Sequence, residues 1–173
     1  SVLDVYFILN YWYLVCFTVE ISFNHYRFFV FLWLALLKPE SKLWQLIKKN
    51  ITSIHWTRLE SWAMPGVPDV YGIQNGISVF VELKVTKSNK IGLSPFQKNW
   101  LYNHYLQGGR SFIMLQHLGQ RLLYIFPSST LHCPLSITTE PCYRVELPAS
   151  PAAWAAVADH LLHCPLPEPE PQV

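Results

Sequence analysis

The sequence predicts an α/β fold, and three local patterns support that prediction. A helix is indicated at residues 39–50 and a β-hairpin at residues 70–84, and a second helix start at Ser94-Pro95 precedes an apolar strand at residues 111–115. The chain has 173 residues, which is enough for one ordinary domain. Apolar residues make up 51% and charged residues 14%, and this composition excludes a disordered or highly charged tail protein.

The first 37 residues are rich in large apolar side chains. Their two uncharged runs, residues 5–19 and 28–37, are each shorter than the roughly 20 residues that span a bilayer, so no membrane partner is expected. The chain begins with Ser1 and its first methionine is Met64. Three interpretations of residues 1–37 stay open: a non-native extension, a membrane anchor, or a packed N-terminal element.

Charge is concentrated in the middle of the chain. Residues 38–126 hold eleven lysines and arginines against four acidic residues, a net charge of +7, whereas the whole chain carries +2. A basic module of this size indicates a polyanionic partner. The four acidic residues of this module are Glu40, Glu60, Asp69 and Glu82.

The first expected helix, residues 39–50, places Leu43, Leu46 and Ile47 on one face, and Glu40 lies in its first turn. The expected hairpin follows and is centred on Asn75-Gly76. This dipeptide favours a type I′ turn, because both central residues of that turn need positive φ.

If Asn75 and Gly76 form the two-residue loop, the numbers of cross-strand partners sum to 151. Asp69 then faces Glu82, and Lys84 projects from the same face two residues further on. The opposite face of the hairpin is apolar, as a sheet buried on one side requires. The charged cluster is therefore expected to face a cleft or solvent. The apolar face comprises Val70, Ile77, Val79, Val81 and Leu83.

The cluster of Asp69, Glu82 and Lys84 has the composition of a metal-dependent hydrolytic site. Paired carboxylates suit Mg²⁺, which takes one or two carboxylates together with substrate phosphate oxygens. A neighbouring lysine can orient a water and offset charge in the transition state. The alternative is a Lys84 salt bridge that neutralises the pair on a solvated face. In a basic module, the cluster indicates a phosphodiesterase that acts on nucleic acid.

At these residues the sequence resembles the PD-(D/E)xK nuclease superfamily. Pro68-Asp69 is followed thirteen residues later by Glu82-Leu83-Lys84. The segment Leu93-Ser94-Pro95-Phe96-Gln97 is similar to a helix start of the virus-type replication-repair nucleases (VRR-NUC), which are Holliday-junction-resolvase-like. The resemblance covers residues 38–126. It implies a restriction-endonuclease-like core, with a mixed central sheet, a catalytic β-hairpin and flanking helices.

The same resemblance implies roles for individual residues. Asp69 and Glu82 would be metal ligands together with the backbone carbonyl of Leu83, and Lys84 would be the catalytic lysine. Gln97 would be an accessory catalytic residue over the site.

The residue types support part of this assignment. Ser94-Pro95 is typical of an N-cap followed by the first helical position, so Gln97 falls in a first turn that favours a nearby phosphate. A solvated surface amide is the alternative for Gln97. The resemblance also implies a further acidic residue from the first helix, and Glu40 occupies that place. Glu60, which precedes the Gly-x-Pro-Asp motif, is the competing candidate.

The expected function is a Mg²⁺-dependent endonuclease, with Mn²⁺ as a substitute metal and no small-molecule cofactor. Its substrate would be structured or branched DNA in phage-like replication, recombination or repair, and its partners DNA and a second copy in a homodimer. The expected location is the cytoplasm, that of the host cell if the protein is phage-encoded. Two alternatives remain: a catalytically silent DNA-binding relative of the same fold, and a small membrane-anchored protein. Candidate DNA contacts are Arg58, Lys87, Lys90 and Lys98, each with a solvated surface base as its alternative.

Beyond the core, residues 127–164 are expected to form a C-terminal extension with a short helix. Ser150-Pro151 predicts the start of that helix, which would run over residues 152–163. Residues 165–173 alternate proline with other residues and predict a disordered tail.

Overall fold

The computed structural model describes residues 38–59, 65–132 and 135–168. The chain divides into two compact units, and the second begins at Pro39. The described elements, in chain order, are α3 (Pro39–Asn50), β1 (His55–Arg58), β2 (Val70–Gln74), β3 (Ile77–Thr86), α4 (Pro95–Leu106), β4 (Ser111–His117), β5 (Leu122–Pro127), the 3₁₀ helix η1 (Ser128–His132), β6 (Tyr143–Glu146) and α5 (Pro151–His163).

The six strands form one mixed sheet in the order β1-β2-β3-β4-β5-β6. Strands β3 and β4 are parallel, and every other neighbouring pair is antiparallel. A parallel pair needs a crossover connection, and α4 supplies it between β3 and β4. The predicted α/β class, with a mixed central sheet, a β-hairpin and flanking helices, is confirmed.

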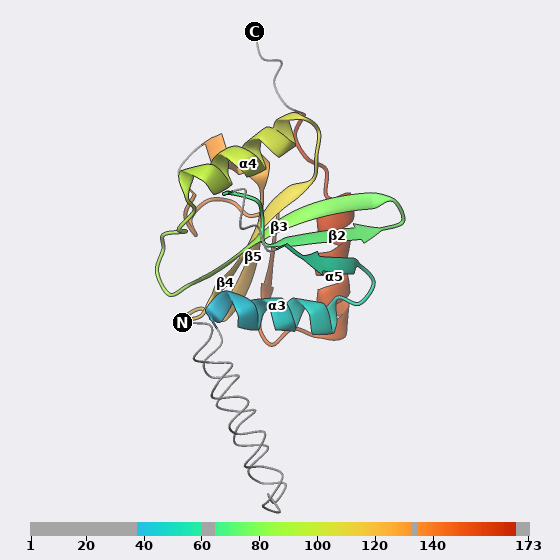
Figure 1. The fold of residues 1–173 in the computed structure, drawn as a ribbon. Coiled ribbons are helices and arrows are strands. Elements are labelled where there is room, and N and C mark those ends of the chain that lie inside the picture. Colours follow the sequence, from blue (N-terminus) through green and yellow to red (C-terminus); the bar gives the residue numbers. More distant parts are fainter. Residues whose placement is uncertain (1–37, 60–64, 133–134, 169–173) are drawn as a thin grey trace, which may run out of the picture. The chain divides into compact units, whose positions relative to one another are not determined.

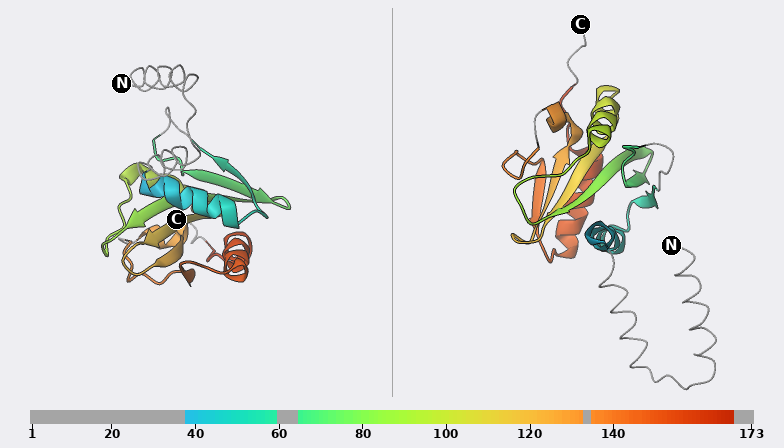
Figure 2. Two further views of the ribbon diagram at one scale, coloured as in Figure 1. Left: turned by 90° about the horizontal axis from the view of Figure 1, so that it is seen from below. Right: turned by 60° about the vertical axis from the view of Figure 1, so that its left-hand side comes forward.

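Helices cover both faces of the sheet. Helices α3 and α5 pack on one face, where they share a core with alternate residues of the strands, and α4 and η1 pack on the other. Figure 1 shows α3 and α4 on opposite sides of the strands, and the right-hand view in Figure 2 shows α5 lengthwise beside the sheet.

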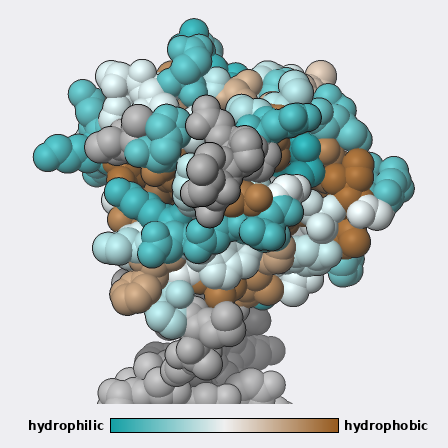
Figure 3. Space-filling view, turned by 90° about the horizontal axis from the view of Figure 1, so that it is seen from above, coloured by the Kyte–Doolittle hydropathy of each residue, from teal (hydrophilic) through white to brown (hydrophobic). Residues whose placement is uncertain are grey.

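The face of the molecule that is seen from the α4 end is mainly polar (Figure 3). Figure 3 looks onto the molecule from the α4 end and shows small apolar patches among hydrophilic residues. The large apolar side chains that stay exposed in the described residues are Phe96 and Leu118. Among these same residues, no helix is long and apolar enough to cross a membrane.

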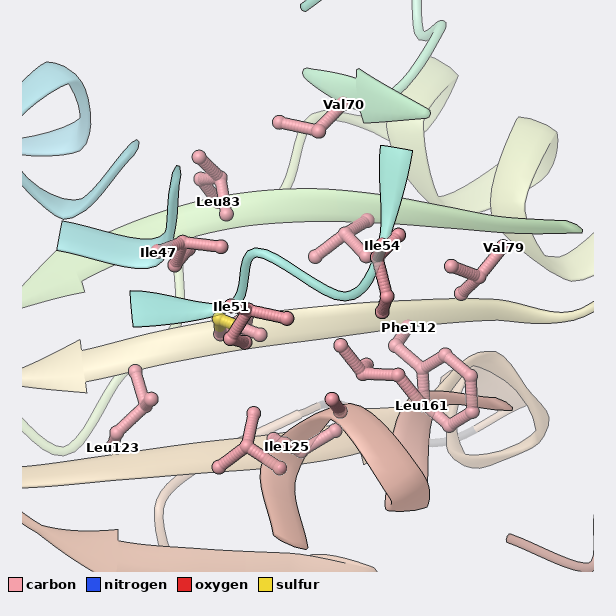
Figure 4. Close-up of a cluster of buried hydrophobic side chains, with 14 of the residues drawn as sticks. Ile47, Ile51, Ile54, Val70, Val79, Leu83, Phe112, Leu123, Ile125 and Leu161 are labelled. Carbon is pink, nitrogen blue, oxygen red and sulfur yellow. The ribbon is translucent and has the colours of Figure 1, made fainter. Parts of the chain in front are cut away.

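Strand β4 lies at the centre of the fold and is buried along nearly its whole length. Phe112 and Met114 point into the α3/α5 core, and Ile113 and Leu115 point into the α4 core. Because both faces of the sheet are covered, this strand is a continuous apolar run and does not alternate with polar residues. Figure 4 shows Leu161 of α5 beside Phe112 in the first of these cores.

Both predicted helix starts are confirmed. Ser94 is the N-cap of α4 with Pro95 at the first helical position, and Ser150 is the N-cap of α5. The Ser150 hydroxyl accepts a hydrogen bond from Ala153 N at 3.2 Å, which satisfies one of the free amides of the first turn.

Residues 127–164, which we expected as an extension, contribute to the same sheet and core. Strand β6 pairs with β5, and α5 places Trp154, Val157 and Leu161 in the core that α3 also enters. Arg110 ties the end of α5 to the sheet, because its Nε and Nη2 donate to the carbonyls of Leu161 and Cys164 at 3.1 and 2.8 Å.

Candidate active site on the β2–β3 hairpin

The hairpin of β2 and β3 has the turn and the register that the sequence predicts. Asn75 and Gly76 both have positive φ, 51° and 80°. Val70 pairs with Val81, and Tyr71 with Phe80, so partner numbers sum to 151. The apolar face of the hairpin enters the α3/α5 core as predicted. Glu82 and Lys84 therefore project from the opposite face, toward α4.

Asp69 stands immediately before β2, where the ladder between the two strands ends. Its Oδ2 accepts a hydrogen bond from Leu83 N at 2.9 Å. Asp69 thus pairs through its side chain with a β3 amide that lies beyond the end of the β2 strand. Its own carbonyl accepts from Leu59 N at 2.8 Å. These two bonds hold the Asp69 carboxylate against β3.

The backbone carbonyl of Leu83 lies at the same edge. In an antiparallel ladder the N–H and C=O of one residue point toward the same neighbouring strand, so this carbonyl faces the Asp69 side. If the register continues, its partner is Pro68, which has no N–H to donate. The sequence thus leaves a backbone oxygen beside the Asp69 carboxylate.

Glu82 is the central residue of the cluster and is only 1% exposed. Its Oε1 accepts from Lys84 Nζ at 2.8 Å and from Gln97 Nε2. Its Oε2 is buried and has no hydrogen-bond partner. One carboxylate oxygen is therefore fully engaged while the other is available to a cation.

Burial raises the pKa of Glu82 from its usual 4.5 to about 7, and the negative charge of Asp69 adds to this rise. The hydrogen bond and positive charge of Lys84, together with a hydrogen bond from the Asp69 backbone, lower the pKa but do not cancel this rise. The site therefore holds negative charge at a cost that a bound cation would relieve.

Gln97 is held in place by the first turn of α4. Ser94 N donates to Gln97 Oε1 at 3.0 Å, and Gln97 N donates to Ser94 Oγ at 3.2 Å, which together form a capping box. Because Oε1 is engaged by the N-cap amide, the amide nitrogen Nε2 is directed at Glu82.

The loop that carries Asp69 packs directly against the same turn. A Cβ atom on Gly66 would lie 2.4 Å from the carbonyl oxygen of Phe96, so no side chain fits there. Gly66 also has a φ of 94°, which favours glycine. This close approach connects the Asp69 loop to the helix turn that positions Gln97.

The expectation that the charged cluster faces a cleft or solvent is wrong for Glu82. Helix α4 lies over this face, and its Trp100 and His104 pack edge-on against Phe80 at 5.0 and 4.9 Å. Only part of the cluster reaches the surface, since Asp69 is half-buried and the Lys84 side chain is 20% exposed. The aromatic cover was not predicted, because a single sequence does not show which residues α4 places over β3.

The other candidate residues lie in different places. Glu40 is half-buried in the first turn of α3. In the described part of the chain, no three His, Cys, Asp or Glu side chains gather as a metal site. Glu60 lies outside the described residues. The candidate DNA contacts are exposed at Arg58, Lys87 and Lys90 and half-buried at Lys98.

The donor set fits a hard divalent cation. It consists of two carboxylates, one of which has an unpartnered buried oxygen, and an adjacent backbone carbonyl. Mg²⁺ is commonly bound by one or two carboxylates, with water and substrate phosphate completing its shell. Zn²⁺ sites usually include His nitrogen or Cys sulfur ligands, and neither residue type belongs to this cluster.

Comparisons with known proteins show distant structural similarity. No family model and no curated protein matches the chain. The solved structure of Hjc, a Holliday junction resolvase from Archaeoglobus fulgidus, is similar at 14% identity and a TM-score of 0.44, covering 64% of this chain and 85% of that one. The structure of SSO0001 is similar at 14% identity and a TM-score of 0.25, covering 60% of this chain and 42% of that one. Similarity this low supports no inference about function.

Proposed function

We propose that this chain is a metal-dependent endonuclease that hydrolyses phosphodiester bonds of DNA. The observation that carries the proposal is the buried Glu82 carboxylate, which keeps one unpartnered oxygen beside a second carboxylate, Asp69. A lysine and a glutamine contact its other oxygen.

A purely structural role for Glu82 fits the geometry poorly. A buried carboxylate is tolerated when its oxygens are paired, and an unpaired one costs free energy. Lys84 and Gln97 both engage Oε1 and leave Oε2 without a partner. Asp69, Glu82 and the Leu83 carbonyl would hold Mg²⁺, with Mn²⁺ as a substitute, and the ion would supply Lewis-acid polarisation of the scissile phosphate.

Lys84 is proposed as the catalytic lysine. Its ammonium group reaches the buried Glu82 oxygen, and its side chain also remains partly exposed at the mouth of the cluster. From there it can donate to an attacking water or to a phosphate oxygen, and its charge offsets the negative charge that builds up at phosphorus. The Glu82 contact limits the positions that this flexible side chain can adopt.

Gln97 is proposed as a positioning residue. Its amide is fixed by Ser94 and donates to Glu82 Oε1, which keeps the Glu82 carboxylate in one orientation. A carboxylate held in this way presents the same oxygen to a cation without a further loss of side-chain entropy.

DNA is the proposed substrate because residues 38–126 carry a net charge of +7. Arg58, Lys87, Lys90 and Lys98 are proposed phosphate contacts, and Glu40 or Glu60 a further acidic residue of the site. Structured or branched DNA, a homodimer, a cytoplasmic location and a role in phage-like replication, recombination or repair remain parts of the proposal that rest on the sequence resemblance.

The test is cleavage by the full chain of labelled duplex, single-stranded, flap and four-way DNA in Mg²⁺, Ca²⁺ or EDTA. We expect cutting in Mg²⁺ and none in EDTA or Ca²⁺. DNA binding in Ca²⁺ without cutting in Mg²⁺ or Mn²⁺ would instead favour the catalytically silent relative. Recovery of the chain in the membrane fraction, with neither activity, would favour the membrane-anchored alternative.

A further inference from the structure

Phe96 is an exception among the phenylalanines that the structure describes. Its side chain is 61% exposed, whereas Phe112 and Phe126 are fully buried and Phe80 is partly buried under α4. Helix α4 packs through Leu101 and Tyr105 and does not use Phe96 for its core contacts. An exposed aromatic ring gains nothing for folding, since burial of a phenylalanine stabilises a protein by about 2 kcal/mol.

The backbone of Phe96 is fixed although its ring is free. The capping box between Ser94 and Gln97 encloses this residue on the helix side. On the loop side, Gly66 approaches so closely that a Cβ atom there would lie 2.5 Å from the carbonyl carbon of Phe96. The ring therefore projects from a defined point.

That point lies at the candidate active site. Phe96 directly precedes Gln97, whose amide contacts Glu82. On its other side it touches Gly66, three residues before Asp69. The exposed ring therefore belongs to a residue whose two neighbours in space, Gln97 and Gly66, both lie close to the candidate site.

We propose that the Phe96 ring stacks on an unpaired nucleobase next to the scissile phosphate and thereby favours DNA with unstacked nucleotides at the cut. The inference rests on the proposed function. Bases in a continuous duplex already stack on their neighbours, whereas a base at a flap, branch or gap offers a free π-face. Stacking of one base on an aromatic side chain is worth roughly a tenfold change in binding.

The test uses the full chain and two DNAs with the same sequence around the cut, one fully paired and one with an unpaired nucleotide at that position. We expect Phe96→Ala to lower the ratio of kcat/KM for the unpaired over the paired DNA about tenfold, mainly through a higher KM, and Phe96→Trp to preserve it. Leu118→Ala is the matched control, because Leu118 is the other exposed large apolar residue and lies in the turn between β4 and β5. An unchanged ratio in Phe96→Ala would overturn the inference.

A second readout separates this inference from the proposed function. The unpaired nucleotide is replaced by 2-aminopurine, and its fluorescence is measured on binding in Ca²⁺, where no cutting is expected. Quenching by the wild-type chain that is lost in Phe96→Ala supports stacking even if the chain cuts no DNA, in which case only the nuclease proposal fails. Equal quenching by both proteins refutes the stacking proposal even if the chain is an active nuclease.

Discussion

Replacement of Glu82 by glutamine should stabilise the metal-free protein at alkaline pH. The Glu82 pKa is raised from 4.5 to about 7 by burial and by the charge of Asp69. Glutamine keeps the shape of the side chain and an oxygen for Lys84 and Gln97 but carries no charge. The substitution therefore removes the cost of ionising a buried carboxylate.

The pH dependence follows from the direction of this shift. The folded pKa lies above the unfolded one, so the folded state binds more protons between pH 4.5 and 7, and stability falls as pH rises through that window. Above pH 7 the cost levels off. The rise of the Glu82 pKa from 4.5 to about 7 corresponds to a loss of folding stability of about 3 kcal/mol at pH 8 and of about 1 kcal/mol at pH 5.

The assay is urea unfolding in EDTA at both pH values. Glu82→Gln should exceed the wild type in free energy of unfolding by about 3 kcal/mol at pH 8 and by about 1 kcal/mol at pH 5. Glu146→Gln is the control, because Glu146 is an exposed residue of β6 and its replacement should change neither value appreciably. An equal gain at both pH values, or a loss of stability at pH 8, would show that ionisation of Glu82 does not destabilise the folded protein.

Addition of Mg²⁺ or Mn²⁺ at pH 8 should narrow or reverse the difference in free energy of unfolding between Glu82→Gln and the wild type. A cation that binds the folded wild type stabilises it by mass action, whereas Glu82→Gln lacks the ligand. Equal stabilisation of both proteins by the metal would argue against Glu82 as a ligand.

Two further substitutions test how the site is positioned. Gly66→Ala should destabilise the fold by roughly 3 kcal/mol in urea unfolding, because the residue has a positive φ and the new Cβ meets the Phe96 backbone. Gly76→Ala is the control: Gly76 also has a positive φ but has open space around it, so the loss of stability should be only about 1 kcal/mol. Similar losses for both would show that the contact with Phe96 is unimportant. Ser94→Ala should cost about 1 kcal/mol and also lower kcat for DNA cleavage, because Gln97 loses its cap. Ser150→Ala is the control, because it removes the cap of α5 at the same cost in stability and should leave kcat unchanged. Equal kcat values for Ser94→Ala and Ser150→Ala would contradict a positioning role of Gln97.

The hairpin was predictable because its geometry is local. Asn75-Gly76 admits one turn type, and that turn fixes the register of every pair up to Val70 and Val81. The helix starts at Ser94 and Ser150 were predictable for the same reason, since a cap depends on residues within one turn.

Features that depend on tertiary packing were not predictable. Strand β1 has only four residues, lies at the sheet edge and is mostly exposed, so it carries no hydrophobic pattern. Glu82 is buried because the crossover helix α4 covers the face of β3 from which Glu82 projects. The alternation of residues along β3 does not show that a helix covers this face. The contact between Gln97 and Glu82 was expected only from the family resemblance.

The most direct test of the account is the single-turnover rate of DNA cleavage in Mg²⁺ by Lys84→Ala, measured beside the wild type and Lys48→Ala. Lys48 is an exposed residue of α3, so its replacement removes one positive charge at a distance from the cluster. We expect Lys84→Ala to lose roughly 100-fold to 10,000-fold in rate while it binds the same DNA in Ca²⁺ nearly as well as the wild type, and Lys48→Ala to cut at the wild-type rate. Cleavage by Lys84→Ala at a rate close to that of the wild type would contradict the assignment of this cluster as the active site.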